Sequence, residues 1–184
     1  MSGPGGEAKR GKPPAPPAMP ETAGCGLSWR LVPIGMVRTQ FLTPAEVPRD
    51  FERVGRATVE IFPDFVGGMG DLEGFSHLWL VTLLNQIEGF DLRVTPRGGG
   101  PKRGLFATRS PRRPNPIGMT LVELLRVEEP FLHVVGADLL DGTPLLDLKP
   151  YLPKNDSVPD ARCGWIGKRG LRDPLHEPKG EGRC

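Results

Sequence analysis

Frequent glycine and proline constrain this chain more than any other feature of its sequence. There are 25 glycines and 22 prolines among 184 residues, about a quarter of the chain, where average usage is nearer ~12%. A chain of this kind is rich in turns or has disordered ends, and we expect both. No apolar run approaches the ~18 residues of a transmembrane helix. Residues 1–26 also lack the apolar core of a signal peptide.

The composition divides the chain into three parts. Residues 1–26 contain no aromatic residue and no Ile, Leu or Val, so they are predicted to be a disordered tail. Residues 163–184 are again rich in Gly, Pro and charge and are predicted to be a flexible basic extension. Residues 27–162 are predicted to form one domain. The three cysteines are too few and too scattered for a disulfide framework, so we expect reduced thiols in a cytoplasmic protein.

Within residues 27–162 the local patterns favour strands. Short β-branched segments bounded by Pro or Gly predict strands at 29–38 and 57–62, and a hairpin of 118–127 with 131–138. Residues 75–84 are apolar on both faces, which predicts a central strand buried on two sides. A helix at 45–53 is only weakly indicated because Pro48 interrupts it. The pattern predicts a mainly β fold, a small antiparallel barrel or sandwich, and disfavours a Rossmann domain.

Positive charge is concentrated in residues 93–119, which we call the cationic loop. Between Leu92 and Val122 there are seven basic residues and no acidic one: Arg93, Arg97, Lys102, Arg103, Arg109, Arg112 and Arg113. Prolines at 111, 114 and 116 stiffen the segment, which suits arginines that bind phosphate or carboxylate. We predict a site for RNA or DNA, centred on Arg103, Arg112 and Arg113. A solvated cationic loop without a partner is the alternative.

A second polar region covers residues 138–153. Asp141-Gly142 is a turn dipeptide, followed by an extended run in which Asp147, Lys149 and Tyr151 alternate. A period of two would place these three side chains on one face, opposite Leu146 and Leu148. The spacing is equally compatible with a functional cluster and with a simple ion pair.

The histidines do not indicate a metal site or a catalytic triad. His77 lies in an apolar strand pattern and is predicted to be a buried, hydrogen-bonded structural residue. His133 and His176 have no partner at metal-ligand spacing, and we predict no metal. From the residues alone, the chain is a small β-rich domain with a binding site of mixed charge.

Three motifs in these regions resemble those of the TsaA-like, TrmO-type methyltransferases. They are FSHLW at 75–79, GLFATRSPRRPNPIG at 104–118 and DGTPLLDLKPY at 141–151, and PIGMVRT at 33–39 fits the first strand of that family. The resemblance covers about residues 29–160. It implies a small β-barrel with a non-Rossmann site for S-adenosylmethionine, usually in a homodimer with the cofactor near the subunit interface. It also implies methylation of threonylcarbamoyladenosine next to the anticodon of tRNA.

The resemblance implies site residues by position in the motifs. The expected cofactor-binding residues are Pro48, Arg49, Asp50, Asn85, Gln86, Arg109, Leu121, Asp141, Gly142, Thr143 and Pro144. An arginine would hold the methionine carboxylate, and Asp141 would suit cationic or hydroxyl groups. The acceptor nitrogen must lose a proton, and Asp147, Lys149 and Tyr151 are the candidates to assist, although the catalytic residue is not identified.

Two positions depart from the family pattern. Family members commonly have His-Gln where this chain has Asn85-Gln86, and Arg-Gln where it has Arg49-Asp50. Asparagine forms hydrogen bonds but does not titrate near neutrality, so an acid–base role of that histidine is lost here. Two alternatives to a tRNA methyltransferase therefore stay open. One is a related methyltransferase that acts on a small molecule or peptide, and the other is a non-catalytic RNA-binding module.

Overall fold

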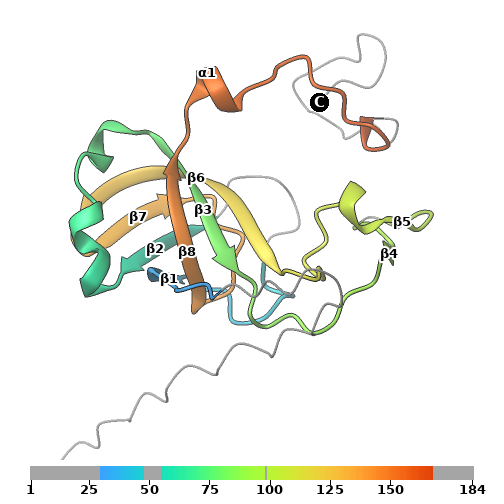
Figure 1. Cartoon of the computed structure of the whole chain (residues 1–184), viewed down its shortest axis with the longest axis horizontal. Helices are drawn as coiled ribbons and strands as arrows, with labels where there is room; N and C mark the ends of the chain where they lie inside the picture. Colours follow the sequence, from blue (N-terminus) through green and yellow to red (C-terminus); the bar gives the residue numbers. More distant parts are fainter. Residues whose placement is uncertain (1–29, 48–54, 98, 168–184) are drawn as a thin grey trace, which may run out of the picture.

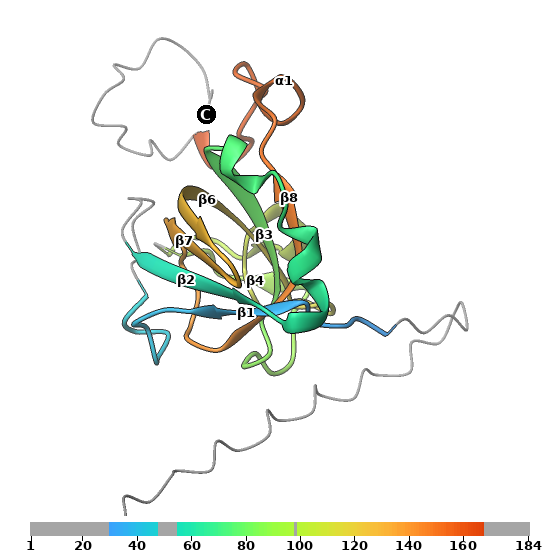
Figure 2. The ribbon, with the colours of Figure 1, turned by 90° about the vertical axis from the view of Figure 1, so that its left-hand side faces the viewer.

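The computed structural model describes residues 30–47, 55–97 and 99–167. Six antiparallel strands close into a barrel in the order β1-β2-β7-β6-β3-β8 (Figures 1 and 2). Their bounds are β1 Gly35–Arg38, β2 Arg56–Ile61, β3 His77–Leu83, β6 Ile117–Glu128, β7 Phe131–Val135 and β8 Thr143–Pro150. The predicted mainly β barrel is confirmed, and the strand order excludes the sandwich alternative.

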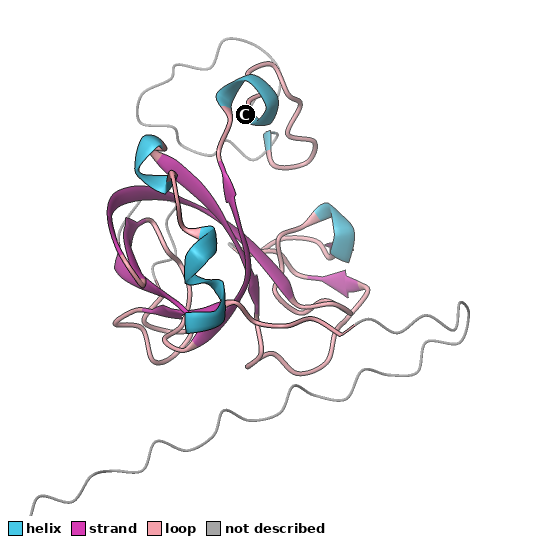
Figure 3. Cartoon of the chain, turned by 60° about the vertical axis from the view of Figure 1, so that its left-hand side comes forward, coloured by secondary structure: helices cyan, strands magenta, loops and turns pink. Residues whose placement is uncertain are grey.

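The remaining elements are short and lie outside the barrel wall. A two-stranded ribbon of β4 (Arg93–Val94) and β5 (Arg103–Gly104) projects from one side (Figure 1). The helices are η1 (Pro63–Gly68), η2 (Leu72–Gly74), η3 (Leu105–Ala107) and α1 (Pro153–Asp156), drawn as short coils in Figure 3. Among the described residues, no helix has the length and apolar character needed to cross a membrane.

The barrel interior is filled by alternate residues of its strands. The largest fully buried side chains include Val37, Val59, Leu78, Leu80 and Leu132. The period of two places every second side chain inside, so β-branched and leucine residues from all six strands meet in one core. Burying one such side chain stabilises the fold by about 1.5–3 kcal/mol. The closed wall makes the loops at the barrel ends the natural places for binding.

The predicted strands are confirmed, and three of them, 29–38, 75–84 and 131–138, are shorter than predicted. The predicted hairpin is β6 with β7, and 57–62 corresponds to β2. The segment 29–38 forms a strand only from Gly35, since Pro33 has no N–H to donate to a ladder. Ile34 extends the pairing by one residue: its N–H donates to the Leu145 carbonyl at 2.8 Å, and its carbonyl accepts the Phe62 N–H at 2.9 Å.

The prediction that residues 75–84 are buried on two sides is wrong. In β3, Leu78, Leu80 and Thr82 are buried inside the barrel, while His77, Trp79, Val81 and Leu83 are half-buried on the outside. A sheet that closes on itself has only one interior. The apolar outer face of β3 is therefore only partly covered by the described residues, among them Tyr151, which contacts His77 and Trp79. His77 is accordingly half-buried rather than buried, although its Nδ1 lies 2.9 Å from Ser76 Oγ as a hydrogen-bond partner.

The facing of β8 also differs from the sequence pattern. Val81 pairs with Asp147 but Thr82 pairs with Leu145, so Leu146 is an extra residue in a β-bulge. Leu145 is buried in the core and Leu148 packs against it, so these two residues point inward on either side of the bulge. Leu146 therefore does not share a face with Leu148 as predicted, because the bulge shifts the alternation by one residue.

Several predicted features lie outside the described residues. They are the 1–26 tail, most of the weak helix at 45–53, and the C-terminal extension beyond residue 167.

Cys163 is disulfide-bonded, which corrects the expectation that all the cysteines are reduced thiols. A pair of cysteines far from any regular framework could not be identified from spacing alone.

Candidate cofactor and RNA site

The strand directions bring four loops to one end of the barrel. Val37 pairs with Thr143, and Thr82 pairs with both Leu145 and Gly118. The ends of β1 and β3 and the beginnings of β6 and β8 therefore meet at this end. The loops there carry residues 39–47, Asn85 with Gln86, Pro114–Pro116 and residues 141–144. We call residues 141–144 the acidic turn.

The acidic turn is held mainly by backbone hydrogen bonds to β1 and the segment after it. The Asp141 N–H donates to the Phe41 carbonyl at 2.8 Å, and the Gly142 N–H donates to the Val37 carbonyl at 2.9 Å. Asp141 Oδ1 accepts the Thr39 N–H at 3.1 Å. Gly142 has a φ of 75°, which favours glycine, and an added Cβ there would meet nothing within 4 Å. The turn is thus a fixed backbone with open space beside a carboxylate.

The other expected cofactor residues lie at different distances from this turn. Asn85 is half-buried and Gln86 exposed, just beyond the end of β3 and therefore at the same end of the barrel. Leu121 pairs with Trp79 on the outer face of the barrel, three residues along β6 from Gly118, or about 10 Å. Pro48, Arg49 and Asp50 lie outside the described residues. The barrel brings Asn85, Gln86 and the acidic turn to one end and leaves Leu121 on its side.

Thr82 places a buried hydroxyl group inside this end of the barrel. Its hydroxyl oxygen is buried and has no hydrogen-bond partner among the described residues. An added Cβ at Gly118 would come within 2.5 Å of that oxygen, so only glycine fits opposite it. The Leu84 N–H donates to the Pro116 carbonyl at 2.7 Å and joins residues 114–116 to the end of β3.

The arginines of the cationic loop fall into two groups. Arg109 and Arg112 are exposed, and within the part of the chain that the structure describes no hydrogen bond or ion pair involves their side chains. Arg113 donates from Nη1 to the carbonyls of Thr108 at 3.0 Å and Ser110 at 3.3 Å. Its guanidinium therefore fixes the shape of the loop. Of the three arginines predicted to bind RNA, Arg112 is free for a phosphate and Arg113 is engaged within the loop.

Arg103 is engaged by a residue that the sequence pattern did not assign to the site. Its guanidinium carbon lies 5.3 Å from the centroid of the Trp165 ring, a cation–π contact. Trp165 Nε1 donates to the Ala107 carbonyl at 2.7 Å. The segment at residues 163–167 therefore packs on the cationic loop. The only sequence signal for this contact was an isolated tryptophan in a Gly- and Pro-rich segment.

The three catalytic candidates share the outer face of the barrel, as the spacing predicted. Lys149 Nζ lies 2.7 Å from Asp147 Oδ2 in an exposed ion pair. Tyr151 forms edge contacts with both His77 and Trp79, with ring centroids 6.2 Å apart in each case. The ion pair is the simpler of the two interpretations that the spacing left open, and at this exposure it stabilises the fold by at most about 1 kcal/mol.

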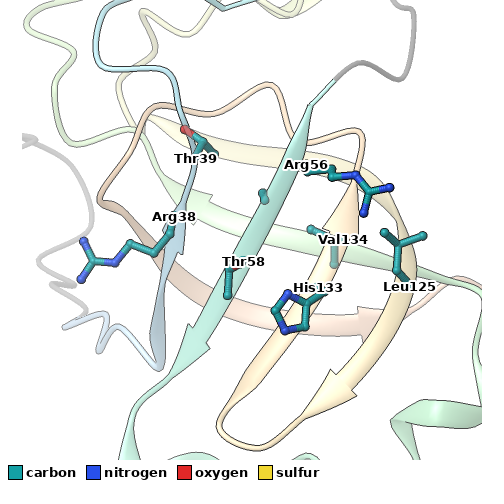
Figure 4. Close-up of a pocket in the computed structure, with 8 residues that line it drawn as sticks. Arg38, Thr39, Arg56, Thr58, Leu125, His133 and Val134 are labelled. Carbon is teal, nitrogen blue, oxygen red and sulfur yellow. The ribbon is translucent and has the colours of Figure 1, made fainter.

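A shallow cavity of about 330 Å³ is lined by residues of β1, β2, β6 and β7 and by Thr39, which follows β1 (Figure 4). Arg38 and Arg56 lie on its rim and point apart. Arg38 is paired with Glu60 at 3.3 Å, and His133 Nε2 lies 3.2 Å from Glu128 Oε2. These partnered charges and the open shape do not form a site for the cofactor, which the loops at the barrel end suit better. Within the described part of the chain, no group of three His, Cys, Asp or Glu residues could hold a metal.

Comparison with known proteins agrees with this architecture. Residues 36–157 match the tRNA-methyltransferase O N-terminal domain. A probable S-adenosyl-L-methionine-binding protein of Pyrococcus abyssi is 40% identical over 157 residues, which cover 82% of each chain. The tRNA (adenine(37)-N6)-methyltransferase of Escherichia coli is 40% identical over 153 residues, covering 75% of this chain and 64% of the relative.

The crystal structure of a TrmO superposes with a TM-score of 0.65 at 40% identity, covering 76% of this chain and 64% of that one. The present chain thus spans somewhat less than two thirds of that TrmO and of the Escherichia coli relative. The matched region begins in β1, ends just after α1 and includes every strand of the barrel. Fold, motifs and sequence identity all coincide over the same residues, and the chain belongs to the TrmO family.

Proposed function

We propose that this protein transfers a methyl group from S-adenosylmethionine to tRNA, at the base nitrogen of threonylcarbamoyladenosine next to the anticodon. Membership of the TrmO family carries this proposal, and its relatives include a tRNA (adenine(37)-N6)-methyltransferase and S-adenosyl-L-methionine-binding proteins. The arrangement of the site supports it: a fixed acidic turn at one barrel end, and an arginine-rich loop that leads into β6 at the same end.

The residues at the barrel end fit S-adenosylmethionine chemically. Asp141 has one carboxylate oxygen bound to Thr39 and the other without a described partner, next to open space at Gly142. That oxygen suits an ammonium group or ribose hydroxyls. The Arg109 guanidinium is exposed and suits a carboxylate. We propose that these residues bind the cofactor together with Asn85, Gln86, Thr143, Pro144 and Leu121, and with Pro48, Arg49 and Asp50.

The bound cofactor supplies an electrophilic methyl group on a sulfonium centre. The protein's contribution to an in-line displacement is alignment of the acceptor nitrogen and exclusion of water. The acceptor nitrogen gains the methyl group and loses its proton. Asp147, Lys149 and Tyr151 are the candidates to accept that proton or to stabilise the charge left behind. Asp147 lies nearest to the acidic turn along β8, and Tyr151 lies at the opposite end of the barrel, where its N–H donates to the His77 carbonyl. Asparagine at position 85 does not titrate near neutral pH and would act there through hydrogen bonds alone.

We also propose that the protein is a homodimer joined through the outer face of β3 and β6. Outward residues there are apolar, including Trp79, Leu121, Ile117 and Met119, the last of which is 60% exposed. A second copy would bury this face. Leu121 would then lie at the interface, where a residue on the side of one barrel can reach a cofactor held by its partner. Sedimentation of wild type and of Met119→Glu tests this proposal, because a buried charge would dissociate the dimer.

The tRNA substrate is tested by a methyl-transfer assay with labelled S-adenosylmethionine. Total tRNA would come from cells that make threonylcarbamoyladenosine and, in parallel, from cells that cannot. We expect label only in the modified tRNA. Label in neither tRNA, with cofactor binding measured by calorimetry, would exclude this substrate. It would favour a methyltransferase with a small-molecule or peptide acceptor, which Asn85 in place of the usual histidine also favours.

A further inference from the structure

The aromatic ring of Phe106 is exposed in the middle of the cationic loop. The residue is 75% exposed, between the buried Leu105 and the exposed Ala107. The segment from Leu92 to Val122 contains no acidic residue. A single exposed apolar residue is ordinary. Phe106 differs from such a residue because its backbone is anchored on both sides and a guanidinium lies beside its ring.

The backbone on both sides of Phe106 is anchored. The Leu105 N–H donates to the Leu92 carbonyl at 2.9 Å, and the Leu105 carbonyl accepts the Thr108 hydroxyl at 2.8 Å. The Ala107 carbonyl accepts the indole N–H of Trp165 at 2.7 Å. With both neighbours held, the ring is presented in one place, and a ligand that stacks on it has little loop entropy to overcome.

Arg113 stacks on this ring from within the loop. Its guanidinium carbon lies 5.8 Å from the Phe106 ring centroid. The same guanidinium donates to the carbonyls of Thr108 and Ser110, which holds it there. At 75% exposure the ring still offers aromatic surface to a second partner. Arg109 and Arg112, both exposed, supply positive charge nearby in the chain.

We infer that Phe106 is a stacking platform for an unpaired base of the bound RNA. Proteins that read RNA loops stack splayed bases on aromatic and arginine planes and hold the backbone with basic side chains. Phe106 with Arg113 supplies the plane, and Arg112, which is exposed, can contact a neighbouring phosphate. The inference rests on the proposed tRNA substrate and specifies which residue holds a loop base.

The chain provides a control that separates stacking from general apolar contact. Leu92 is 63% exposed and belongs to the same region, since its carbonyl binds the Leu105 N–H. A docking surface for an apolar protein partner would use both residues and would tolerate leucine in place of Phe106. Stacking requires a ring at 106 and does not depend on Leu92.

The test measures binding of an anticodon stem-loop RNA that carries 2-aminopurine at one loop position at a time. Wild type, Phe106→Leu, Phe106→Trp and Leu92→Ala are compared. We expect Phe106→Leu to raise the RNA dissociation constant about tenfold or more and to abolish the fluorescence quenching at one loop position. Phe106→Trp should retain both binding and quenching, and Leu92→Ala should match wild type. Calorimetry should give the same affinity for S-adenosylmethionine in all four proteins.

The outcomes separate this inference from the proposed function. Methylation of tRNA by wild type with equal RNA affinity in Phe106→Leu would overturn the stacking role and leave the proposed function in place. Equal losses in Phe106→Leu and Leu92→Ala would also overturn it, in favour of apolar contact. Failure of wild type to bind either the stem-loop or whole tRNA would overturn both proposals.

Discussion

The acidic turn and the cationic loop are both candidate binding surfaces, but they are held in place differently. Backbone hydrogen bonds to the Val37 and Phe41 carbonyls fix the turn, so its shape comes from the barrel. The loop lies beyond the barrel wall and is fixed by side chains, chiefly Arg113 and Trp165. Substitution of the Asp141 side chain should therefore change binding with little change in the shape of the turn. In the cationic loop, Arg113 both contributes positive charge and fixes the backbone conformation, so one substitution there changes both.

The largest expected effect contrasts a glycine of the barrel with one of the loop. A Cβ at Gly35 would collide with the backbone carbonyl oxygen of Glu60, whereas one at Gly104 would meet nothing within 4 Å. Gly35→Ala should lower the free energy of unfolding by about 3 kcal/mol because β1 and β2 must separate. Gly104→Ala should leave it nearly unchanged. Urea denaturation measures both, and equal effects would show that the loop is as tightly packed as the barrel.

A smaller effect is expected for the carboxylate of the acidic turn. Asp141→Ala removes a charged acceptor from the proposed cofactor site and should raise the dissociation constant of S-adenosylmethionine about ten- to hundredfold. Asp141→Asn keeps an acceptor for the Thr39 N–H and loses only the charge. Calorimetry with both variants separates the two contributions. Unchanged affinity in Asp141→Ala would remove the acidic turn from the site.

Two neighbouring arginines test whether charge and shape can be separated in the loop. Arg112→Glu should weaken RNA binding and lower the slope of log affinity against log salt by about 1, without loss of stability. Arg113→Glu should weaken RNA binding and also destabilise the loop, because the Thr108 and Ser110 carbonyls lose their donor. Filter binding at several salt concentrations and hydrogen exchange at residues 105–113 give the two readouts. Equal effects of the two substitutions on RNA affinity and on hydrogen exchange would show that Arg112 and Arg113 have the same role.

The smallest effect concerns the segment that follows β1. Hydrogen bonds from Leu42 and Thr43 to the Glu46 carboxylate lower its pKa below the ordinary value of 4.5. Ionised Glu46 therefore stabilises the folded form above pH 4.5, and this contribution disappears as the pH falls through the lowered pKa. The stability difference between wild type and Glu46→Gln should be present near neutral pH and vanish in acid. A difference independent of pH would contradict the role of the charge.

The sequence predicted the barrel well because its strands are short, alternating and punctuated by Gly and Pro. The outer face of β3 was misjudged since an apolar strand looks the same whether a second layer or a partner covers it. The facing of Leu146 was missed because a bulge is a property of two paired strands, not of one. The grouping at one barrel end of Asn85, Gln86 and the acidic turn required strand directions that no single segment encodes.

The division of the cationic loop could not be predicted from composition. Seven basic residues in the sequence look alike, but Arg113 is held by carbonyls of its own loop and Arg103 by Trp165, 62 positions further along the chain. Contacts of this kind depend on tertiary structure. The implied roles of Arg109 and Arg112 remain predictions, and their exposure leaves both free for a ligand.

The position of β8 in the barrel has a consequence for how the chain is made. β8 pairs with β1 on one side and β3 on the other, and it is the last strand of the barrel to be synthesised. On the ribosome, β1 and β3 each keep an unpaired edge until residues 143–150 have emerged. Closure joins segments more than a hundred residues apart, a long-range topology that slows folding. The nascent barrel therefore exposes two strand edges during most of its synthesis, which makes this stage the one most in need of chaperone protection.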